Sequence, residues 1–381
     1  MRKSKSLVIY FIVLALFGNS LTAVACTSVV LGQGDRVLLG QNYDFAYTHG
    51  AIFVNASGKK KQALVDKGDL SMKWESRYSS VVFSQFGREL PTSGMNEEGL
   101  TIQLLWNEDG IFPEVDAKTT PTLGELSWVQ YQLDTAMSVK EVVDSFAHVA
   151  IKKAYADLHY IVCEASGDCA LLEYENNELR VYHRGDDFRP AVITNSSLIN
   201  SKKFYSQFRD RALSDIPKKK KSLNVYARTA WLVENGLGAS VAEKPSSSDM
   251  FSVLSEAKLD YEFTDMFRWI FSGQPPSITA WSAVFSPSGR WIEFRSHENQ
   301  KVRRIELIKL FRKCDSPDLA MNLDDGTVGE INSFFDSNAQ RENLRIIRAS
   351  YEPIRNLAPR DVQDALFDYA ESHFCGEGKR P

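Results

Sequence analysis

The chain has 381 residues, of which 43% are hydrophobic and 25% are charged, and its formal net charge is −4. A chain of this length buries enough apolar surface for one large domain or two ordinary ones. The charges are scattered and mildly acidic in sum, which argues against nucleic acid as the main partner because such binding needs a basic surface. The clearest basic run, Lys218 to Lys221, follows Pro217 and is interpreted as a solvated loop.

The first 25 residues have the three parts of a secretory leader. A basic stretch at residues 2–5 precedes the apolar run Leu7–Phe17, and the small residues Ala23 and Ala25 stand just before Cys26. The apolar run is shorter than the ~20 residues that span a bilayer, and no later segment reaches that length. We therefore predict an exported protein, periplasmic or secreted, that begins at Cys26 and has no stable membrane insertion. Loss of three basic residues would change its net charge to −7.

Strands and helices follow in alternating blocks. A first hairpin is predicted from Thr27–Gly32 and Arg36–Gly40, joined by a Gln-Gly-Asp turn. Later strands are predicted at Ala51–Asn55, Ser79–Phe86, Leu100–Leu105, within Leu158–His183, at Ala191–Thr194, and in a hairpin of Ile278–Phe285 and Trp291–Ser296. A turn is expected at Gly94–Gly99. Helical periodicity marks Thr122–Leu133, Ser138–Ala147, Asn224–Asn235, Asp249–Leu254 and much of the chain after Cys314, with a capping box at Ser138 and Glu141. This order predicts an α+β fold with stacked sheets and outer helices.

Five cysteines are an odd number, so at least one thiol has no partner within the chain. Cys163 and Cys169 flank a Glu-Ala-Ser-Gly-Asp turn, and Cys314 and Cys375 bracket the C-terminal segment. Disulfides within these two pairs are plausible in an oxidising compartment and would leave Cys26 free. Connectivity is not determined by the sequence, but Cys26 is the thiol that we expect to be left over on chemical grounds.

A cysteine at a new N-terminus carries a nucleophile and a free amine on one residue. The α-amine has a pKa of ~7.7–8.0, so it can accept the thiol proton and later return a proton to a leaving amine. Such a centre also needs a carboxylate and donors for an oxyanion; Asp44, at the end of the first hairpin, is the candidate carboxylate. Two other interpretations stay open. In the first, Cys26 is the lipid-modified residue of a lipoprotein, although Ala23 stands where such leaders usually have Leu. In the second, Cys26 is an incidental cysteine near the cleavage site.

No metal or cofactor is expected. The sequence contains no His-Glu-x-x-His, Cys-x-x-Cys, Gly-x-Ser-x-Gly or phosphate-binding glycine-lysine motif, and its six histidines do not pair at metal-ligand spacing. His159 lies in an apolar strand and is interpreted as a core histidine rather than a base.

In their joint order, several motifs resemble the choloylglycine hydrolase and penicillin V acylase family of N-terminal-nucleophile hydrolases, which act on linear amides. The matching segments are Cys26–Ser28, Gly40–Phe45, Gly94–Leu100, Leu158–Tyr160, Ser166–Asp168, Ile193–Ser196, Thr279–Trp281 and Arg303–Leu307. The resemblance spans Cys26 to about Leu310. It implies a four-layer αββα sandwich at residues 26–312, after a leader at 1–25 and before a helical C-terminal extension at 313–381.

The resemblance also implies roles for individual residues. Cys26 would be nucleophile and, through its amine, base, and Asp44 would hold the amine and the thiol. Asn195 would donate its amide to the oxyanion, and the segment of Trp106 and Asn107 would supply the second oxyanion group. A Trp at this place resembles the penicillin V acylases of Gram-negative bacteria, which also resemble acyl-homoserine-lactone acylases.

Two positions depart from the family pattern. Gln41 and Val225 stand where the family usually has arginines, and Arg228, one helical turn after Val225, is expected to substitute for the second. Without a cation beside it the thiolate would be less stabilised, and Gln41 would hold the substrate differently. The segment from Gln41 to Asp44 also resembles a related acyltransferase branch that works on β-lactam side chains.

Together these observations predict an exported cysteine amidase whose partner is a small-molecule acyl amide such as penicillin V. Tyr43, Phe45 and Trp106 are candidates for an apolar acyl pocket. Bile salts and acyl-homoserine lactones are alternative substrates, and relatives are often homotetramers. The competing hypothesis is a non-catalytic envelope lipoprotein that retains the fold.

Overall fold

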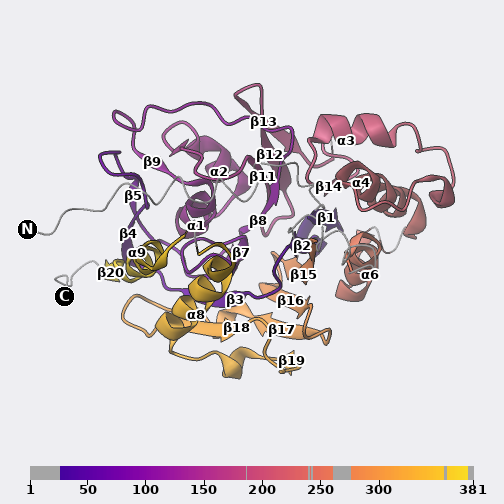
Figure 1. Ribbon diagram of the computed structural model, residues 1–381. Helices are drawn as coiled ribbons and strands as arrows, with labels where there is room; N and C mark the ends of the chain where they lie inside the picture. The colour runs from indigo at the N-terminus through magenta and orange to yellow at the C-terminus, as the bar shows by residue number, and fades with distance from the viewer. Residues whose placement is uncertain are drawn as a thin grey trace, which may run out of the picture.

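The computed structural model describes residues 26–185, 187–238, 241, 243–260, 276–355 and 358–375 (Figure 1). The predicted leader, residues 1–25, lies outside these ranges. None of the helices within them combines the length and the apolar character of a bilayer-crossing helix.

Two large, mostly antiparallel sheets form the centre of the fold. The first has seven strands and the second has eight. In spatial order, the first sheet contains β14 (Val192–Ile193), β1 (Thr27–Leu31), β2 (Leu38–Phe45), β15 (Ile278–Ser286), β16 (Trp291–Ser296), β17 (Arg303–Glu306) and β19 (Gly329–Glu330). The second contains β13 (Glu178–His183), β12 (Cys169–Glu175), β11 (Leu158–Cys163), β8 (Thr101–Trp106), β7 (Ser93–Asn96), β6 (Ser80–Ser84), β3 (Ala51–Asn55) and β18 (Leu319–Asn322).

The alternation of side chains along each strand divides the core into layers. Leu105 and Ile161 belong to the cluster between the sheets, whereas Leu104 and Tyr160, one residue away, belong to the cluster under α1 (Glu125–Thr135) and α2 (Val139–Ser145). The other face of the first sheet packs against α3 (Leu198–Tyr205), α4 (Ser222–Trp231) and α6 (Ser247–Ala257). Figure 1 shows these two helical groups on opposite sides of the sheets. The predicted αββα sandwich is confirmed.

Polar contacts also join the two sheets. The hydroxyl of Ser28 on β1 donates to Gln103 Oε1 on β8 at 2.7 Å, and Gln41 Nε2 on β2 donates to the carbonyl of Leu104 at 3.2 Å. Buried polar side chains need such partners because an unpaired buried group costs about 1–3 kcal/mol. These bonds hold β8 over the start of β1, where Cys26 lies.

The structure differs from the sequence prediction at several element ends. Residues 94–96 of the predicted turn lie in β7, and only residues 97–100 make the turn. Helix α1 begins at Glu125 because Thr122 and Leu123 form β9, which pairs with β10 (Ala150–Ile151). The Ser138 hydroxyl caps α2 by accepting the Glu141 N–H at 3.2 Å, but the Glu141 carboxylate accepts the N–H of Met137 instead of that of Ser138.

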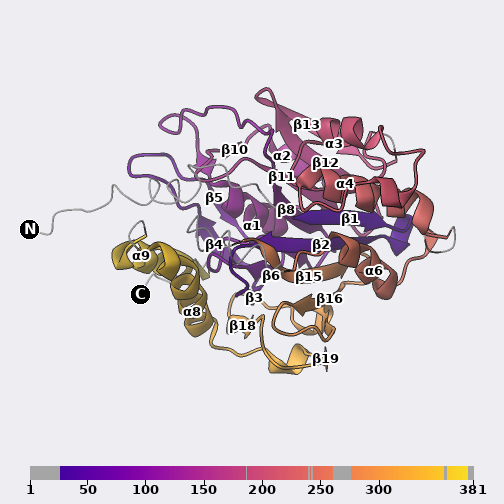
Figure 2. The ribbon, with the colours of Figure 1, turned by 45° about the vertical axis from the view of Figure 1, so that its right-hand side comes forward.

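The C-terminal extension contains more than the predicted helices α8 (Ala339–Tyr351) and α9 (Arg360–Glu371). Its strand β18 pairs antiparallel with β3 and so extends the second sheet, and β20 (Phe374–Cys375) joins a small sheet with β4 (Lys59–Gln62) and β5 (Lys73–Glu75). Figure 2 shows α8 and α9 side by side against the edge of this region. Strand pairing therefore crosses the boundary expected at residue 312, because the edge of β3 offers unpaired backbone groups to the returning chain.

Both predicted disulfides are present. Cys163 is bonded to Cys169 across the β11–β12 turn, and Cys314 is bonded to Cys375 across the extension. Cys26 is the free cysteine among the described residues. The four cysteines of these two bonds lie far from the first strand in sequence, and the free thiol is that of Cys26, directly before β1.

Candidate active site

The pairing of β1 with β2 brings Cys26 against Asp44. Thr27 is paired with Asn42, so the residue before Thr27 lies beside the end of β2. Cys26 Sγ is 3.5 Å from the Asp44 carbonyl oxygen and accepts the Asp44 N–H at 3.4 Å. Burial, together with the nearby Asp44 carboxylate, raises the pKa of the Cys26 thiol well above its usual range. In this state the thiol is protonated and needs a base close by.

Asp44 is a buried carboxyl group with one hydrogen-bonded oxygen. Its Oδ1 accepts the hydroxyl of Thr279, on β15, at 2.5 Å, and Thr279 Oγ1 in turn accepts the Leu259 N–H at 2.8 Å. Burial raises the pKa of Asp44 to about 8, and the Thr279 hydrogen bond lowers it in part. The second oxygen, Oδ2, is buried and has no hydrogen-bond partner among the described residues. An orphaned buried oxygen of this kind is uncommon and calls for a donor.

Asn195 lies across β1 from Asp44. The antiparallel register pairs Ser28 with Ile193 and Val29 with Val192, and its continuation by two residues sets Asn195 opposite Cys26. The side chain of Asn195 is 2% exposed. The β1–β14 pairing thus brings the Asn195 backbone near Cys26, and the role of its amide as an oxyanion donor stays a prediction.

Asn107 follows β8 and is joined to the Asn195 segment by backbone hydrogen bonds. The N–H of Glu108 donates to the Asn195 carbonyl at 2.8 Å, and the N–H of Ser197 donates to Asp109 Oδ2 at 2.9 Å. Asn107 is buried, and its Nδ2 has no hydrogen-bond acceptor in the described part of the chain. The two segments expected to bind an oxyanion are therefore hydrogen-bonded to each other, and the Asn107 side-chain amide has no described acceptor.

A buried histidine supports the same unit. His159 is fully buried, as expected of a core histidine, and its Nδ1 is 3.0 Å from Glu173 Oε2. Glu173 Oε1 also accepts the N–H of Leu198 at 3.1 Å, at the start of α3 and three residues after Asn195. The pair therefore holds the loop that carries Asn195. The sequence showed an apolar strand around His159 but no sign of this contact.

The three aromatic residues predicted to bind an acyl group belong to a larger cluster. Phe45 contacts Phe86 with ring centroids 5.6 Å apart, Phe86 contacts Tyr155 at 6.5 Å, and Tyr155 contacts Trp106 at 5.9 Å. These four rings are all partly exposed. Sequence reasoning missed Phe86 and Tyr155 because both lie in connections far along the chain from Phe45 and outside any recognisable motif.

Tyr43 differs from the other aromatic residues because it is buried. Its ring stacks on Trp281 at 4.1 Å with an interplanar angle of 14°, and its hydroxyl donates to Gln85 Oε1 at 3.1 Å. Only 3% of the residue is exposed. Tyr43 therefore packs in the core between Trp281 and Phe45, whose ring centroid is 6.1 Å away, and offers little surface to a ligand.

Neither Gln41 nor Arg228, the residue expected to substitute at Val225, brings a positive charge to Cys26 in the contacts described. Gln41 is fully buried, and its Oε1 has no described hydrogen-bond partner. Arg228 was expected to substitute for the residue at Val225. Its Nε donates to Glu256 at 2.6 Å, and its Nη1 donates to two backbone carbonyls of the 213–216 turn. The Glu256 contact joins α4 to α6, the carbonyl contacts join α4 to the 213–216 turn, and none of the three reaches Cys26.

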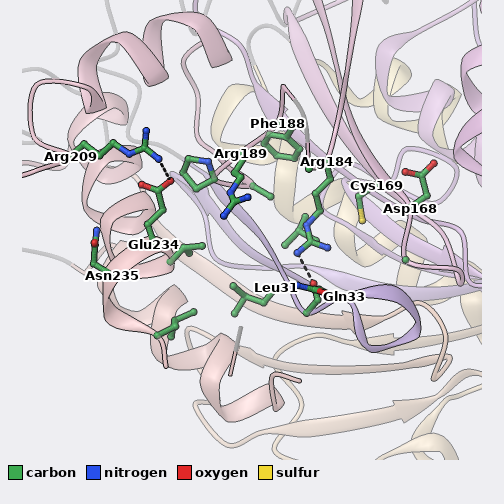
Figure 3. Close-up of a pocket in the computed structure, with 18 of the residues that line it drawn as sticks. Leu31, Gln33, Asp168, Cys169, Arg184, Phe188, Arg189, Arg209, Glu234 and Asn235 are labelled. Carbon is green, nitrogen blue, oxygen red and sulfur yellow. Dashed lines mark hydrogen bonds and ion pairs between the residues drawn. The ribbon is translucent and has the colours of Figure 1, made fainter. Parts of the chain in front are cut away.

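A separate cleft of about 800 Å³ opens at the other end of β1 from Cys26 (Figure 3). Arg184 reaches across it to the Gly32 carbonyl at 2.6 Å, and Arg209 pairs with Glu234 at 3.0 Å. None of the candidate catalytic residues lines this cleft, and its lining contains three acidic and three basic side chains. The described residues also contain no cluster of His, Cys, Asp and Glu able to hold a metal ion.

Comparison with known proteins places this arrangement in context. Residues 26–238 match the model of the linear amide C–N hydrolases, choloylglycine hydrolase family. Penicillin V acylase of Pectobacterium atrosepticum is 27% identical over 348 aligned residues, which cover 81% of this chain and 88% of that protein.

Two solved structures share the fold. The penicillin V acylase of Agrobacterium tumefaciens superimposes with a TM-score of 0.68 at 23% identity and covers 82% of this chain and 96% of its own. A conjugated bile acid hydrolase of Clostridium perfringens gives a TM-score of 0.60 at 17% identity, with 79% and 95% covered. The likeness therefore extends over nearly the whole of each solved structure.

Proposed function

The chain belongs to the choloylglycine hydrolase family and is a hydrolase of linear amide C–N bonds, and we propose that it is an exported amidase with Cys26 as its N-terminal nucleophile. Removal of residues 1–25 would free the α-amine of Cys26. The observation that carries this proposal is the buried Asp44 Oδ2, which has no described hydrogen-bond partner next to the thiol.

The α-amine supplies what this carboxylate lacks. While the Ala25–Cys26 peptide bond is intact, the Cys26 nitrogen is an uncharged amide, and the pKa of Asp44 is raised to about 8 by burial. An α-ammonium group beside Asp44 would favour the ionised carboxylate and lower this pKa. The two disulfides suit an oxidising compartment and so support the proposed export.

The reaction then divides into two acyl-transfer steps. The α-amine takes the thiol proton, directly or through one water, and Sγ attacks the carbonyl carbon of the amide. The side-chain amides of Asn195 and Asn107 stabilise the tetrahedral oxyanion. The C–N bond breaks as the ammonium returns a proton to the leaving amine, and a thioester to Cys26 remains. Water attacks this thioester with the α-amine as base, so a carboxylic acid is released and the thiol is restored.

We propose an aryl-substituted acyl group, such as the phenoxyacetyl group of penicillin V, as the preferred substrate class. The partly exposed rings of Phe45, Phe86, Tyr155 and Trp106 offer faces and edges at 5.6–6.5 Å spacing, to which a flat aryl group packs well. Bile salts and acyl-homoserine lactones carry no aryl ring and are the alternative substrates. Assembly as a homotetramer stays a prediction that light scattering can test.

The competing lipoprotein hypothesis predicts a different charge beside Asp44. Acylation of the Cys26 amine would remove its positive charge and leave a buried carboxylate facing a neutral amide. Mass spectrometry of the mature protein distinguishes the two: a free Cys26 supports the amidase, and an added lipid mass contradicts it.

The decisive experiment is hydrolysis by the chain that begins at Cys26. Penicillin V, glycocholate, taurocholate and an acyl-homoserine lactone are supplied separately, and amine release is measured for the wild type and for Cys26→Ala. We expect penicillin V to be cleaved fastest and Cys26→Ala to be inactive. Equal turnover by Cys26→Ala would refute the nucleophile, and faster cleavage of glycocholate would refute the acyl preference.

A further inference from the structure

The C-terminal extension contacts residues 85–88, the first part of the connection between β6 and β7 in the hydrolase core. The Ser350 hydroxyl donates to the Gln85 carbonyl, and the Arg88 N–H donates to Asn343 Oδ1 at 2.8 Å. Gly87 lies against Ile347, where an added Cβ would come within 3.1 Å of the side chain. Every residue from 85 to 88 therefore has a contact with α8 or its neighbours, since Phe86 packs in the same cluster as Ile347.

Ion pairs of the buried Arg88 strengthen the contact between the extension and this connection. The Arg88 guanidinium pairs with Asp318 and, at 3.0 Å, with Glu371, so it joins the segment before β18 to the end of α9. Arg88 is 4% exposed, and removal of one partner from a buried ion pair is strongly destabilising. The Cys314–Cys375 disulfide closes the extension into a loop around these contacts.

The same connection faces the aromatic cluster on its other side. Gln85 accepts the hydroxyl of Tyr43 and donates its Nε2 to the carbonyls of Tyr47 at 2.8 Å and His49 at 3.1 Å. Phe86 contacts both Phe45 and Tyr155. Residues 85 and 86 thus link the extension to β2, on which Tyr43 and Phe45 flank Asp44.

Tyr351 is a residue of the extension whose ring contacts Phe86. Its ring centroid is 6.5 Å from that of Phe86, and it lies close enough to Tyr155 to raise the pKa of that hydroxyl further, after burial itself. It is 8% exposed and in the same apolar cluster as Ile347. It therefore stands behind Phe86 and Tyr155, away from solvent.

We infer that the extension forms the back wall of the acyl site and that Tyr351 sets the preference for aryl acyl groups by positioning Phe86 and Tyr155. The inference rests on the proposed function, because it assumes that the acyl group lies on these rings. Tyr351 is a positioning residue: it touches the rings that contact the acyl group, not the reacting atoms. Figures 1 and 2 both place α8 beside β3 and β18, where the extension joins the sheet that contains β6, and residues 85 and 86 follow β6 directly.

The test compares two amides of one amine, a phenoxyacetyl amide and an acetyl amide. The ratio of their kcat/KM values is measured for the wild type, Tyr351→Ala, Tyr351→Phe and Tyr369→Ala. Tyr369 is a matched control, because it is also a buried tyrosine of the extension and its ring contacts His373 outside the aromatic cluster. A loss of stability alone would lower both rates together.

We expect Tyr351→Ala to lower the phenoxyacetyl-to-acetyl ratio about fivefold, the scale of one aromatic contact. Tyr351→Phe and Tyr369→Ala should keep the ratio within about twofold of the wild type on the same reasoning. An unchanged ratio in folded Tyr351→Ala, or an equal fall in Tyr369→Ala, would overturn the inference. If Tyr351→Ala does not fold, Tyr351→Leu removes the ring while keeping much of its volume.

Binding of phenoxyacetate, measured by calorimetry, separates this inference from the proposed function. If the wild type hydrolyses neither amide, the amidase proposal fails. Weaker phenoxyacetate binding by Tyr351→Ala than by Tyr369→Ala would still support the back wall, and equal binding by the two would contradict it.

Discussion

Retention of a single residue before Cys26 is the sharpest perturbation of the proposed chemistry. A chain that begins at Ala25 keeps the thiol, Asp44 and the fold, but the Cys26 nitrogen stays an amide that cannot accept a proton. We expect kcat for a phenoxyacetyl amide to fall by 10²–10⁴-fold, the usual contribution of a positioned general base.

The same change should alter how stability depends on pH. With the amide in place, the pKa of Asp44 is about 8 in the folded chain and 3.8 as an unperturbed group. The folded state then binds more protons than the unfolded state between these two values, so the free energy of unfolding falls as pH rises. At ~1.4 kcal/mol per pH unit, the loss from pH 4 to pH 7 is about 4 kcal/mol. In the chain that begins at Cys26, the α-ammonium lowers the folded pKa of Asp44 and removes much of this loss.

Both chains can be prepared from a cleavable fusion and checked by mass spectrometry. Urea unfolding at pH 4.5 and pH 7 then gives the stability difference, which should be small at the lower pH and larger at the higher one. Asp44→Asn in the chain that begins at Ala25 is the control, and it should remove the extra pH dependence. If the Ala25 chain retains activity within about tenfold of the Cys26 chain, below the range expected of a lost base, the α-amine is not the base.

Three further substitutions test the surroundings of the thiol. Thr279→Val removes the donor to Asp44 Oδ1, so the pKa of Asp44 should rise, the acid limb of the kcat/KM profile should move to higher pH, and stability should fall by about 1–3 kcal/mol; a pH profile that does not move would contradict this. Asn195→Ala should lower kcat by 10²–10³-fold with little change in Tm, as expected of an oxyanion donor, and a change in KM alone would exclude that role. Glu173→Gln weakens the hydrogen bond that the Leu198 N–H donates to residue 173, so kcat should fall by about tenfold and stability by about 1–3 kcal/mol. An unchanged kcat would show that this hydrogen bond does not position Asn195.

Local patterns in the sequence were enough to predict the fold class and much of the element order. Apolar alternation marked the β1–β2 hairpin, and the short turn between Cys163 and Cys169 predicted a disulfide that the structure contains. Both signals act over a few residues, where backbone geometry and side-chain spacing are determined by neighbours in the chain. Asp44 was predicted as the candidate carboxylate from its place at the end of this hairpin, and the structure puts its backbone against the Cys26 thiol.

Contacts between distant segments could not be predicted in this way. Arg228 has the residue type of a missing family cation, yet tertiary packing turns it toward Glu256 and the carbonyls of the 213–216 turn. A side chain one helical turn from the expected position can point in several directions, and its contacts with α6 form only when the helices pack.

The division is clearest around the thiol itself. From the sequence, Cys26 was the thiol expected to be left free and Asp44 was the candidate carboxylate at the end of the same hairpin, and the structure has Cys26 free and beside Asp44. Only the tertiary structure decided that Asp44 Oδ2 is left without a described partner, that Thr279 bonds the other oxygen, and that Tyr351 stands behind the acyl site. These contacts join residues hundreds of positions apart, and which side chains meet across such distances is decided by how the sheets and the extension pack together.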